Sequence, residues 1–166
     1  LVNEFSNFAR MPRPILKKID IIQLVNTSLN LTKLSSKNSI NLFSKLNKQY
    51  IKGDEDQLNR VFINLIKNSE ESILEQLQKD PNFKGNIDIE IVDNNDYIVI
   101  RLTDNGIGIT DAKKAMTPYF TTKRTGTGLG LPIVTKIINE HSGNFSIKNR
   151  RDKQGVVITI ILPKYA

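Results

Sequence analysis

The sequence predicts an α+β protein built as a two-layer α/β sandwich, and three observations support this prediction. Segments with apolar residues at helical spacing alternate with segments in which apolar and polar residues alternate. Most predicted strands follow one another through short turns, which favours a mixed but mostly antiparallel sheet. The chain has 166 residues, of which 39% are hydrophobic, and this is enough to form one core. We therefore expect one such sheet, covered by three helices.

The three helices are predicted from their periodicity and their end signals. Asp20 is a suitable N-cap for a helix that runs to about Leu34. The longest helix is expected over Glu55 to Gln78, where apolar residues follow a 3.6-residue period until Asp80-Pro81 ends it. A third helix is expected over Leu129 to His141, before Ser142-Gly143.

The strands are predicted between these helices, and their order completes the α/β pattern. One strand is expected over Ile40 to Leu46 and a short one at Tyr50–Ile51. The remaining strands form two pairs, which cover Ile87–Ile91, Ile98–Leu102, Phe145–Ile147 and Val157–Leu162. Asn94-Asn95-Asp96 lies between the first two of these, as expected for a β-hairpin.

The N-terminal residues differ from the rest of the chain. Leu1 to Ala9 carries apolar residues at helical spacing, so we interpret it as the end of an upstream helix. Met11-Pro12-Arg13-Pro14 then interrupts any helix, and residues 10–19 are predicted to be a linker. This divides the chain into residues 1–19 and a globular domain over residues 20–166. The chain lacks an initiator Met and a signal-peptide pattern, so we expect it to be a fragment of a longer protein.

Composition limits the classes of function. The chain has no cysteine, which excludes disulfides and thiolate metal sites, and it has one histidine. A net charge of +7 could attract nucleic acid, an anionic membrane or a polyphosphate. No cluster of Arg and Lys is interleaved with aromatic residues, so we interpret the charge as a solvated surface and predict no nucleic-acid partner. No apolar run is long enough to span a bilayer.

A first candidate site lies at Asp104-Asn105-Gly106-Ile107-Gly108, directly after a predicted strand. A carboxylate at a strand end can accept a hydrogen bond from an exocyclic amine, and glycines let a flat ring approach the backbone. The segment lacks the third glycine and the βαβ context of a dinucleotide-binding motif. Taken alone, it could equally be a structural turn.

A second candidate site is the run Gly126-Thr127-Gly128-Leu129-Gly130, which leads into the third helix. Glycines at a helix N-terminus offer unpaired N–H groups to an anion. Thr121, Thr122 and Lys123 precede it and add two hydroxyls and an ammonium group that suit phosphate oxygens. The alternative interpretation of these glycines is a flexible hinge.

A third candidate site is Asn64 and Asn68, which lie on one face of the long helix because they are four residues apart. Amide oxygens are suitable ligands for a Mg²⁺ ion that is held mainly by phosphates and water. The alternative is that both amides only form hydrogen bonds to a neighbouring loop.

Taken together, these motifs resemble the catalytic ATP-binding domain of sensor histidine kinases, part of the Bergerat-fold ATPase superfamily that includes gyrase and Hsp90. The family's N box corresponds to residues 56–68 and its G1 box to Asp104-Asn105-Gly106-Ile107-Gly108-Ile109. The F box corresponds to Tyr119-Phe120-Thr121-Thr122-Lys123, and the G2 box to Gly126-Thr127-Gly128-Leu129-Gly130-Leu131. The resemblance extends from about Asp20 to Pro163 and has its motifs in the family's order.

The resemblance implies ATP and Mg²⁺ as cofactors and assigns roles to the motif residues. Asp104 would bind the adenine amine, with Gly106, Gly108 and Ile109 beside the base. Asn68 would ligate Mg²⁺, and Asn64 would support the metal or the phosphates. The lid and the phosphate loop would supply the remaining contacts, which come from Thr121, Thr122, Lys123, Gly126, Thr127, Gly128, Leu129 and Gly130.

Two features narrow the resemblance further. The superfamily's hydrolytic members carry a Glu four residues before the metal-binding Asn, where this chain has Asn64. An amide cannot accept the proton of an attacking water, which favours phosphoryl transfer over hydrolysis. Residues 2–14 are similar to the end of the dimerisation helix in NtrY-like nitrogen-regulation kinases, which identifies that branch of the family.

The resemblance also places the reaction in a two-component system. His141 is rejected as phospho-acceptor, because the family often has a structural histidine at the end of this helix. The acceptor would lie on upstream dimerisation helices, and a response-regulator aspartate would receive the phosphoryl group next. We therefore expect a monomeric fragment of a homodimeric kinase, on the cytoplasmic side of a bacterial inner membrane that anchors the full-length protein. The alternatives are an anti-sigma-type serine kinase and a non-catalytic nucleotide-binding module of the same fold.

Overall fold

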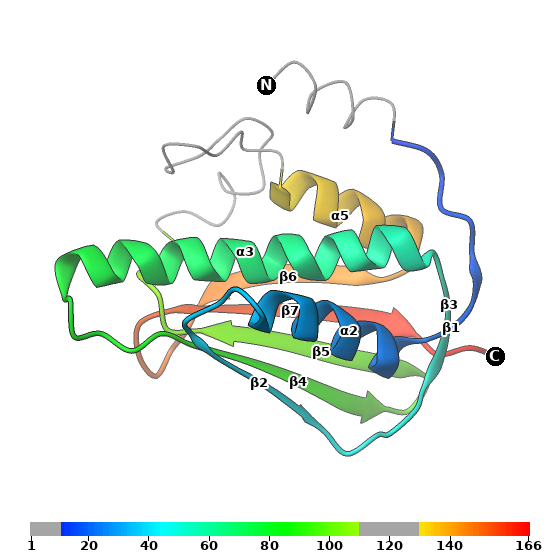
Figure 1. Cartoon of the computed structure of the whole chain (residues 1–166). Coiled ribbons are helices and arrows are strands. Elements are labelled where there is room, and N and C mark those ends of the chain that lie inside the picture. Colours follow the sequence, from blue (N-terminus) through cyan, green and yellow to red (C-terminus); the bar gives the residue numbers. More distant parts are fainter. Residues whose placement is uncertain (1–10, 110–129) are drawn as a thin grey trace.

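The computed structural model describes residues 11–109 and 130–166, which form a five-stranded sheet with helices on one face (Figure 1). The strand order is β2-β4-β5-β7-β6. These strands are β2 (Ser39–Ser44), β4 (Asn86–Asn94), β5 (Tyr97–Asp104), β7 (Val156–Pro163) and β6 (Asn144–Asn149). The helices in the described ranges are α2 (Ile21–Lys33), α3 (Glu55–Lys79) and α5 (Gly130–Glu140). The predicted two-layer α+β sandwich is therefore confirmed.

The sheet is mixed and mostly antiparallel, as predicted. β2 and β4 are parallel, whereas the pairs β4–β5, β5–β7 and β6–β7 are antiparallel. The predicted hairpin joins β4 to β5 with Ile91 opposite Ile100. Its turn includes Asn95 at φ 57°, a left-handed conformation that asparagine tolerates better than most residues.

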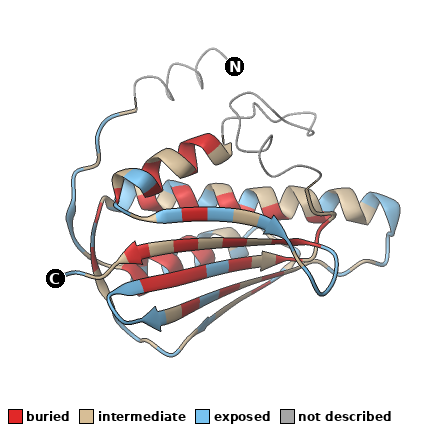
Figure 2. Cartoon of the chain, turned by 180° about the vertical axis from the view of Figure 1, so that it is seen from behind, coloured by how far each residue is buried: buried red, intermediate tan, exposed pale blue. Residues whose placement is uncertain are grey.

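The core lies between the helices and the sheet. Buried residues largely alternate with more exposed ones along β4, β5 and β7 (Figure 2), as expected for strands with one face against the helices. Phe62, Leu65 and Ile66 of α3 are almost completely buried in the same cluster. This packing fixes α3 along the sheet, and the side chains at its two ends are thereby fixed as well.

The main difference from the sequence prediction lies in the linker. Lys17–Asp20 forms a strand, β1, that pairs antiparallel with β3 (Tyr50–Gly53) and places Ile19 opposite Ile51. The segment is short and mostly charged, so alternation could not indicate a strand. The linker prediction is therefore wrong for residues 17–19, while the upstream helix expected at Leu1 to Ala9 lies outside the described residues.

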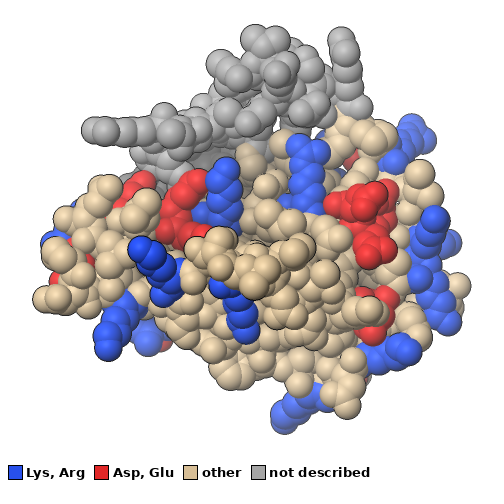
Figure 3. Space-filling view, viewed as in Figure 1, with Lys and Arg blue, Asp and Glu red and all other residues tan. Residues whose placement is uncertain are grey.

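Two observations concern the membrane and nucleic-acid interpretations: one is on the described helices, the other on the face seen in Figure 3. Within residues 11–109 and 130–166, no helix combines the length and apolar character needed to cross a bilayer. On the face seen in Figure 3, Lys and Arg side chains are dispersed, with Asp and Glu between them. Mixed charges of this kind are typical of a solvated surface.

His141 has the structural role that the sequence predicted. Its side chain is buried directly after α5. Nε2 accepts a hydrogen bond from the backbone N–H of Asp54 at 3.0 Å, and Nδ1 lies 2.8 Å from the carbonyl of Ile137. The ring is therefore the tautomer with its proton on Nδ1, and it connects the end of α5 to the start of α3.

We expect His141→Ala to lower the free energy of unfolding by about 2–4 kcal/mol, measured by urea denaturation. The substitution removes a buried ring and leaves the Asp54 N–H without its acceptor. Asn139→Ala is the control, because Asn139 is exposed on the same helix and its loss should change stability by less than about 0.5 kcal/mol. Equal effects of the two substitutions would contradict a structural role for the imidazole.

Candidate functional site

The centre of the candidate site is Asp104, the last residue of β5. Its side chain is buried, with 3% of the residue surface exposed. Oδ2 accepts a hydrogen bond from the Ser69 hydroxyl of α3 at 2.9 Å, and Oδ1 accepts one from the Gly106 N–H at 2.9 Å. The carboxylate is thus held between the sheet and α3, and it keeps unused lone pairs for a further donor.

The environment of Asp104 makes its carboxylate a strong acceptor at a fixed position. Burial raises the pKa of this carboxyl group, and hydrogen bonds from Gly106 and Ser69 offset only part of the increase. A buried carboxylate gains more from a donor than an exposed one, because little water competes for it. A neutral amine, such as the exocyclic amine of a base, is a suitable donor for this position.

The glycines after Asp104 let the loop lie directly against α3. A Cβ at Gly106 would overlap the Ser72 hydroxyl and lie 2.8 Å from the Ser72 backbone carbon. Gly108 has φ +85°, and a Cβ there would lie 2.7 Å from Oδ1 of Asn149. The structure therefore requires glycine at both positions for steric reasons, and it places them beside Asp104 as the sequence indicated.

The backbone of Ile109 is held by a residue that sequence reasoning missed. The Asn149 side chain, at the end of β6, accepts from the Ile109 N–H at 2.8 Å and donates to the Ile109 carbonyl at 2.6 Å. This pair of hydrogen bonds holds the backbone of Ile109 at the end of β6. An Asn at a strand end has no distinctive signal in a single sequence, so only the fold identifies it.

Two further residues support Asp104 from the turn between β6 and β7. The Arg150 guanidinium donates to the Asp104 carbonyl at 3.3 Å and forms an ion pair with Asp152 at 3.1 Å. Gly155 has φ +130°, and a Cβ there would overlap the Asp104 carbonyl oxygen. The turn therefore packs closely on the backbone of Asp104, which explains the glycine.

Ser69 is a missed residue for which the sequence does contain a signal. It lies in the stripe of α3 formed by Leu58, Val61, Phe62, Leu65, Ile66 and Ile73, and it is the polar member of that buried face. A buried serine between apolar residues needs a hydrogen-bond partner. The strand-end carboxylate was the available acceptor.

Asn64 and Asn68 lie on α3, and both are partly exposed. The Asn68 amide nitrogen lies 3.8 Å from the position that a Cβ on Gly130 would occupy. The structure thus places Asn68 beside the N-terminal end of α5, where backbone N–H groups are unpaired within the helix. The other predicted phosphate contacts lie outside the described residues: Thr121, Thr122, Lys123, Gly126, Thr127, Gly128 and Leu129.

The donor set fits a divalent cation only in the presence of an anionic ligand. Among residues 11–109 and 130–166, no group of three or more His, Cys, Asp or Glu side chains could hold a metal ion. Asn68 offers a neutral amide oxygen, which suits Mg²⁺ but contributes no charge. A Mg²⁺ ion at this position would therefore need phosphate oxygens as its main ligands.

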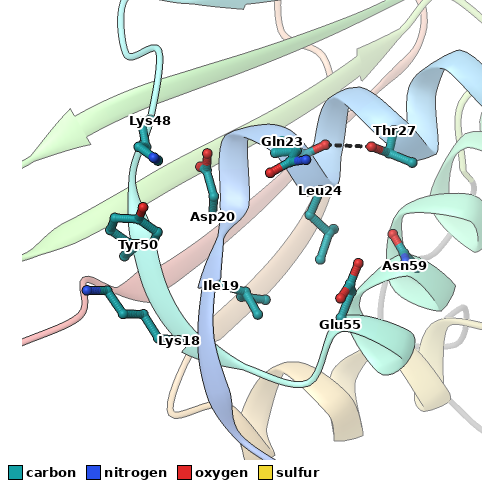
Figure 4. Close-up of a pocket in the computed structure, with 10 residues that line it drawn as sticks. All are labelled: Lys18, Ile19, Asp20, Gln23, Leu24, Thr27, Lys48, Tyr50, Glu55 and Asn59. Carbon is teal, nitrogen blue, oxygen red and sulfur yellow. Dashed lines mark hydrogen bonds between the residues drawn. The ribbon is translucent and has the colours of Figure 1, made fainter.

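A cavity of about 430 Å³ lies elsewhere, between α2, β1, β3 and the start of α3 (Figure 4). Its lining includes Lys18, Asp20, Tyr50, Glu55 and Asn59 and contains none of the predicted site residues. The Lys18 ammonium lies 4.5 Å from the centre of the Tyr50 ring. This cavity is therefore separate from the site around Asp104.

Comparison with known proteins relates this geometry to one family. Residues 53–166 match the family described as histidine kinase-, DNA gyrase B- and HSP90-like ATPases. The putative sensor histidine kinase NtrY-like of Rickettsia conorii is 36% identical over 163 residues, which cover 96% of this chain and 26% of that protein. The chain thus spans about a quarter of the length of this curated relative.

Solved structures show the same fold. The catalytic domain of histidine kinase ThkA has a TM-score of 0.76 and 26% identity, over 90% of this chain and 95% of that one. Histidine kinase ThkA in complex with the response regulator TrrA has a TM-score of 0.80 and 22% identity, over 99% of this chain and 46% of that one. The second likeness concerns the fold alone.

We expect Asp104→Asn to leave the domain folded and to raise its melting temperature at pH 7. Asparagine keeps an acceptor for the Gly106 N–H and can donate to Ser69, and it removes a buried charge. The pKa of Asp104 is raised in the folded state. The carboxyl group therefore contributes most to stability at pH values below its ordinary pKa of 3.8. This contribution is lost as the pH rises through the folded-state pKa.

Thermal unfolding between about pH 4 and 7 tests this expectation, because the advantage of asparagine should shrink as the pH falls. Asp96→Asn, in the exposed hairpin turn, is the control and should change little. A melting temperature of Asp104→Asn well below the wild-type value at pH 7 would show that the carboxylate stabilises the fold.

Proposed function

Because the chain belongs to the family of histidine kinase-, DNA gyrase B- and HSP90-like ATPases, we propose that it is the ATP-binding catalytic domain of a two-component sensor histidine kinase. The observation that carries the proposal is the buried Asp104 carboxylate, held by Ser69 and Gly106 at the start of a glycine-containing loop. The relatives that the chain matches are named as sensor histidine kinases. Each role below is proposed for this chain.

The base of ATP would bind at Asp104. Its amine would donate to a carboxylate oxygen that already accepts one hydrogen bond, and this second bond uses a free lone pair. The close packing of Gly106 on Ser72 and of Gly108 on Asn149 would hold the loop backbone in place beside the base. The Asn149 hydrogen bonds to Ile109 would keep that wall of the site in place.

The phosphates would lie between α3 and the start of α5. Unpaired N–H groups of a helix N-terminus attract an anion, and Gly130 begins α5 next to Asn68. Asn68 would hold Mg²⁺ together with the phosphate oxygens, with Asn64 one helical turn away on the same face. When bound, Mg²⁺ neutralises charge on the phosphates.

The reaction would be phosphoryl transfer to a histidine on a dimerisation helix. The bond between the γ-phosphorus and the bridging oxygen breaks, its electron pair leaves with ADP, and a bond from an imidazole nitrogen to phosphorus forms. This domain would act by holding and orienting ATP, because such a transfer needs positioning more than covalent chemistry. Asn64 provides no general base for an attacking water, which limits the competing hydrolysis.

A response regulator would then receive the phosphoryl group on an aspartate. Histidine kinase ThkA, whose fold this chain shares, has been crystallised with the response regulator TrrA. We propose a partner of the same class here, and a homodimer for the full-length kinase. The cytoplasmic location of this domain and the membrane anchor of the full-length protein remain predictions from the resemblance.

We expect ATP with Mg²⁺ to raise the melting temperature by about 5–10 °C when ATP is about 100-fold above its Kd. Mg²⁺ alone should give no shift, because the described residues offer no charged metal site. Asp104→Asn should abolish the shift, and Asn68→Ala should abolish only the part that depends on Mg²⁺. Lys79→Ala, exposed in the last turn of α3 and outside the N box, is the control. An unshifted wild-type protein would exclude nucleotide binding.

We expect the chain to phosphorylate a separately prepared dimerisation domain on histidine when ATP labelled in its γ-phosphate is added. The label should be labile in acid and stable in alkali, and Asp104→Asn should give none. Acid-stable phosphoserine on a partner would instead indicate the anti-sigma class. Nucleotide binding without any transfer would indicate a non-catalytic module.

A further inference from the structure

Residues 11–16 are held against the N-terminal end of α3 although they form no helix or strand. We name them the strap. The strap leads into β1 and passes the start of α3 (blue in Figure 1). Its first residue, Met11, packs against the hydrophobic core. This segment is therefore anchored where a free linker would have been expected.

Two hydrogen bonds fasten the strap to α3. The Gln57 side-chain amide donates to the Pro12 carbonyl at 2.9 Å. The Ile15 N–H donates to Oδ2 of Asp54 at 2.8 Å. Pro12 and Pro14 restrict the backbone between these points, so a small number of contacts is enough to define its path.

Asp54 connects the strap to the start of α3 and to the end of α5. While Oδ2 binds the strap, Oδ1 accepts from the Gln57 N–H and caps α3. The N–H of Asp54 donates to His141, at the end of α5. Burial acts to raise the pKa of Asp54. The backbone N–H groups that its carboxylate binds together have the larger effect and lower the pKa, so the carboxylate stays ionised and able to accept.

Both helices that meet at Asp54 extend toward the candidate nucleotide site. Asn68 lies 14 residues along α3, about 20 Å from Asp54. α5 runs from Gly130, beside Asn68, to the buried His141. Because both helices pack on the same core, the position of the strap is defined relative to the site at their other ends.

We propose that the strap is a positioning latch, which fixes the direction in which the preceding chain leaves the domain and so orients an upstream acceptor relative to the bound nucleotide. This inference rests on the proposed function. Transfer between two domains requires the acceptor to reach the nucleotide at a defined distance and angle. If residues 11–16 were unattached, the chain before them could leave the domain in many directions. The two hydrogen bonds and the packing of Met11 restrict it to one direction.

Spin-label distances in the 166-residue chain test the latch directly. The chain has no cysteine, so Arg13→Cys and Lys67→Cys introduce two unique labelling sites, both exposed and on the strap and α3 respectively. Ile15→Pro removes the N–H that binds Asp54. Ile15→Ala is the matched control, because it keeps the N–H and removes a side chain that is 70% exposed.

We expect a narrow distance distribution in the Ile15→Ala protein and a clearly broader one in the Ile15→Pro protein. Gln57→Met, which keeps the side-chain size and removes the donor to Pro12, should broaden it as well. Both variants should melt within a few degrees of the control, since neither substitution enters the core. Equally narrow distributions in all proteins, or equally broad ones, would overturn the latch.

The functional test uses the kinase extended upstream to include its acceptor histidine. There Ile15→Pro should lower the kcat of histidine phosphorylation about tenfold or more with the KM for ATP unchanged. Unchanged kcat would overturn the positioning role. In the 166-residue chain, the shift that ATP causes should be the same for Ile15→Pro and Ile15→Ala. If even the wild-type protein shows no shift, the proposed function fails while the distance measurement still decides the latch.

Discussion

A carboxylate buried at the end of a central strand must be compensated by hydrogen bonds, and this requirement shapes the structure around Asp104. Ser69 approaches from α3 and the Gly106 N–H from the following loop, so the helix and the loop are both drawn toward one group. Close approach then excludes side chains at Gly106 and Gly155, whose Cβ atoms would overlap Ser72 and the Asp104 carbonyl. The burial that raises the pKa of Asp104 also keeps water from competing for its free lone pairs. Burial of the Asp104 carboxylate thus costs stability, and the same burial would strengthen a hydrogen bond from an amine.

α3 connects the surroundings of Asp104 with the region around Asp54. Its buried face packs on the sheet, its middle carries Asn64, Asn68 and Ser69, and its N-terminal end is capped by Asp54. A helix of 25 residues held along its length behaves as one rigid element, so its ends cannot move independently. The strap and the candidate nucleotide site are therefore fixed relative to each other, although they lie near different parts of α3.

The layered fold could be predicted because its signals are local. Periodicity located α3 and the hairpin of β4 and β5. The glycines after Asp104 were interpreted as room for a flat ring, whereas in the structure they let the loop pack on Ser72 and Asn149. The contacts of Asn149 and Arg150 could not be predicted, because they arise where β6 and β7 meet the loop after β5 and depend on tertiary packing. The strand β1 was missed for a related reason. Lys17–Asp20 becomes a strand through its pairing with β3, and its own residues carry no alternation that would show it.

The environment of the single histidine bears on the proposed transfer reaction. Both ring nitrogens of His141 are engaged, one with the Asp54 N–H and one with the Ile137 carbonyl, and the ring is buried. Phosphorylation of either nitrogen would require the ring to leave the junction between α3 and α5. In the proposed reaction the phosphoryl group would therefore leave this domain, since the sequence has one histidine. The acceptor would come to the nucleotide from another segment or chain, and the efficiency of transfer would depend on how the domain is oriented toward it. The same imidazole that cannot accept the phosphoryl group helps to fix Asp54, and Asp54 holds the strap through which that orientation would be set.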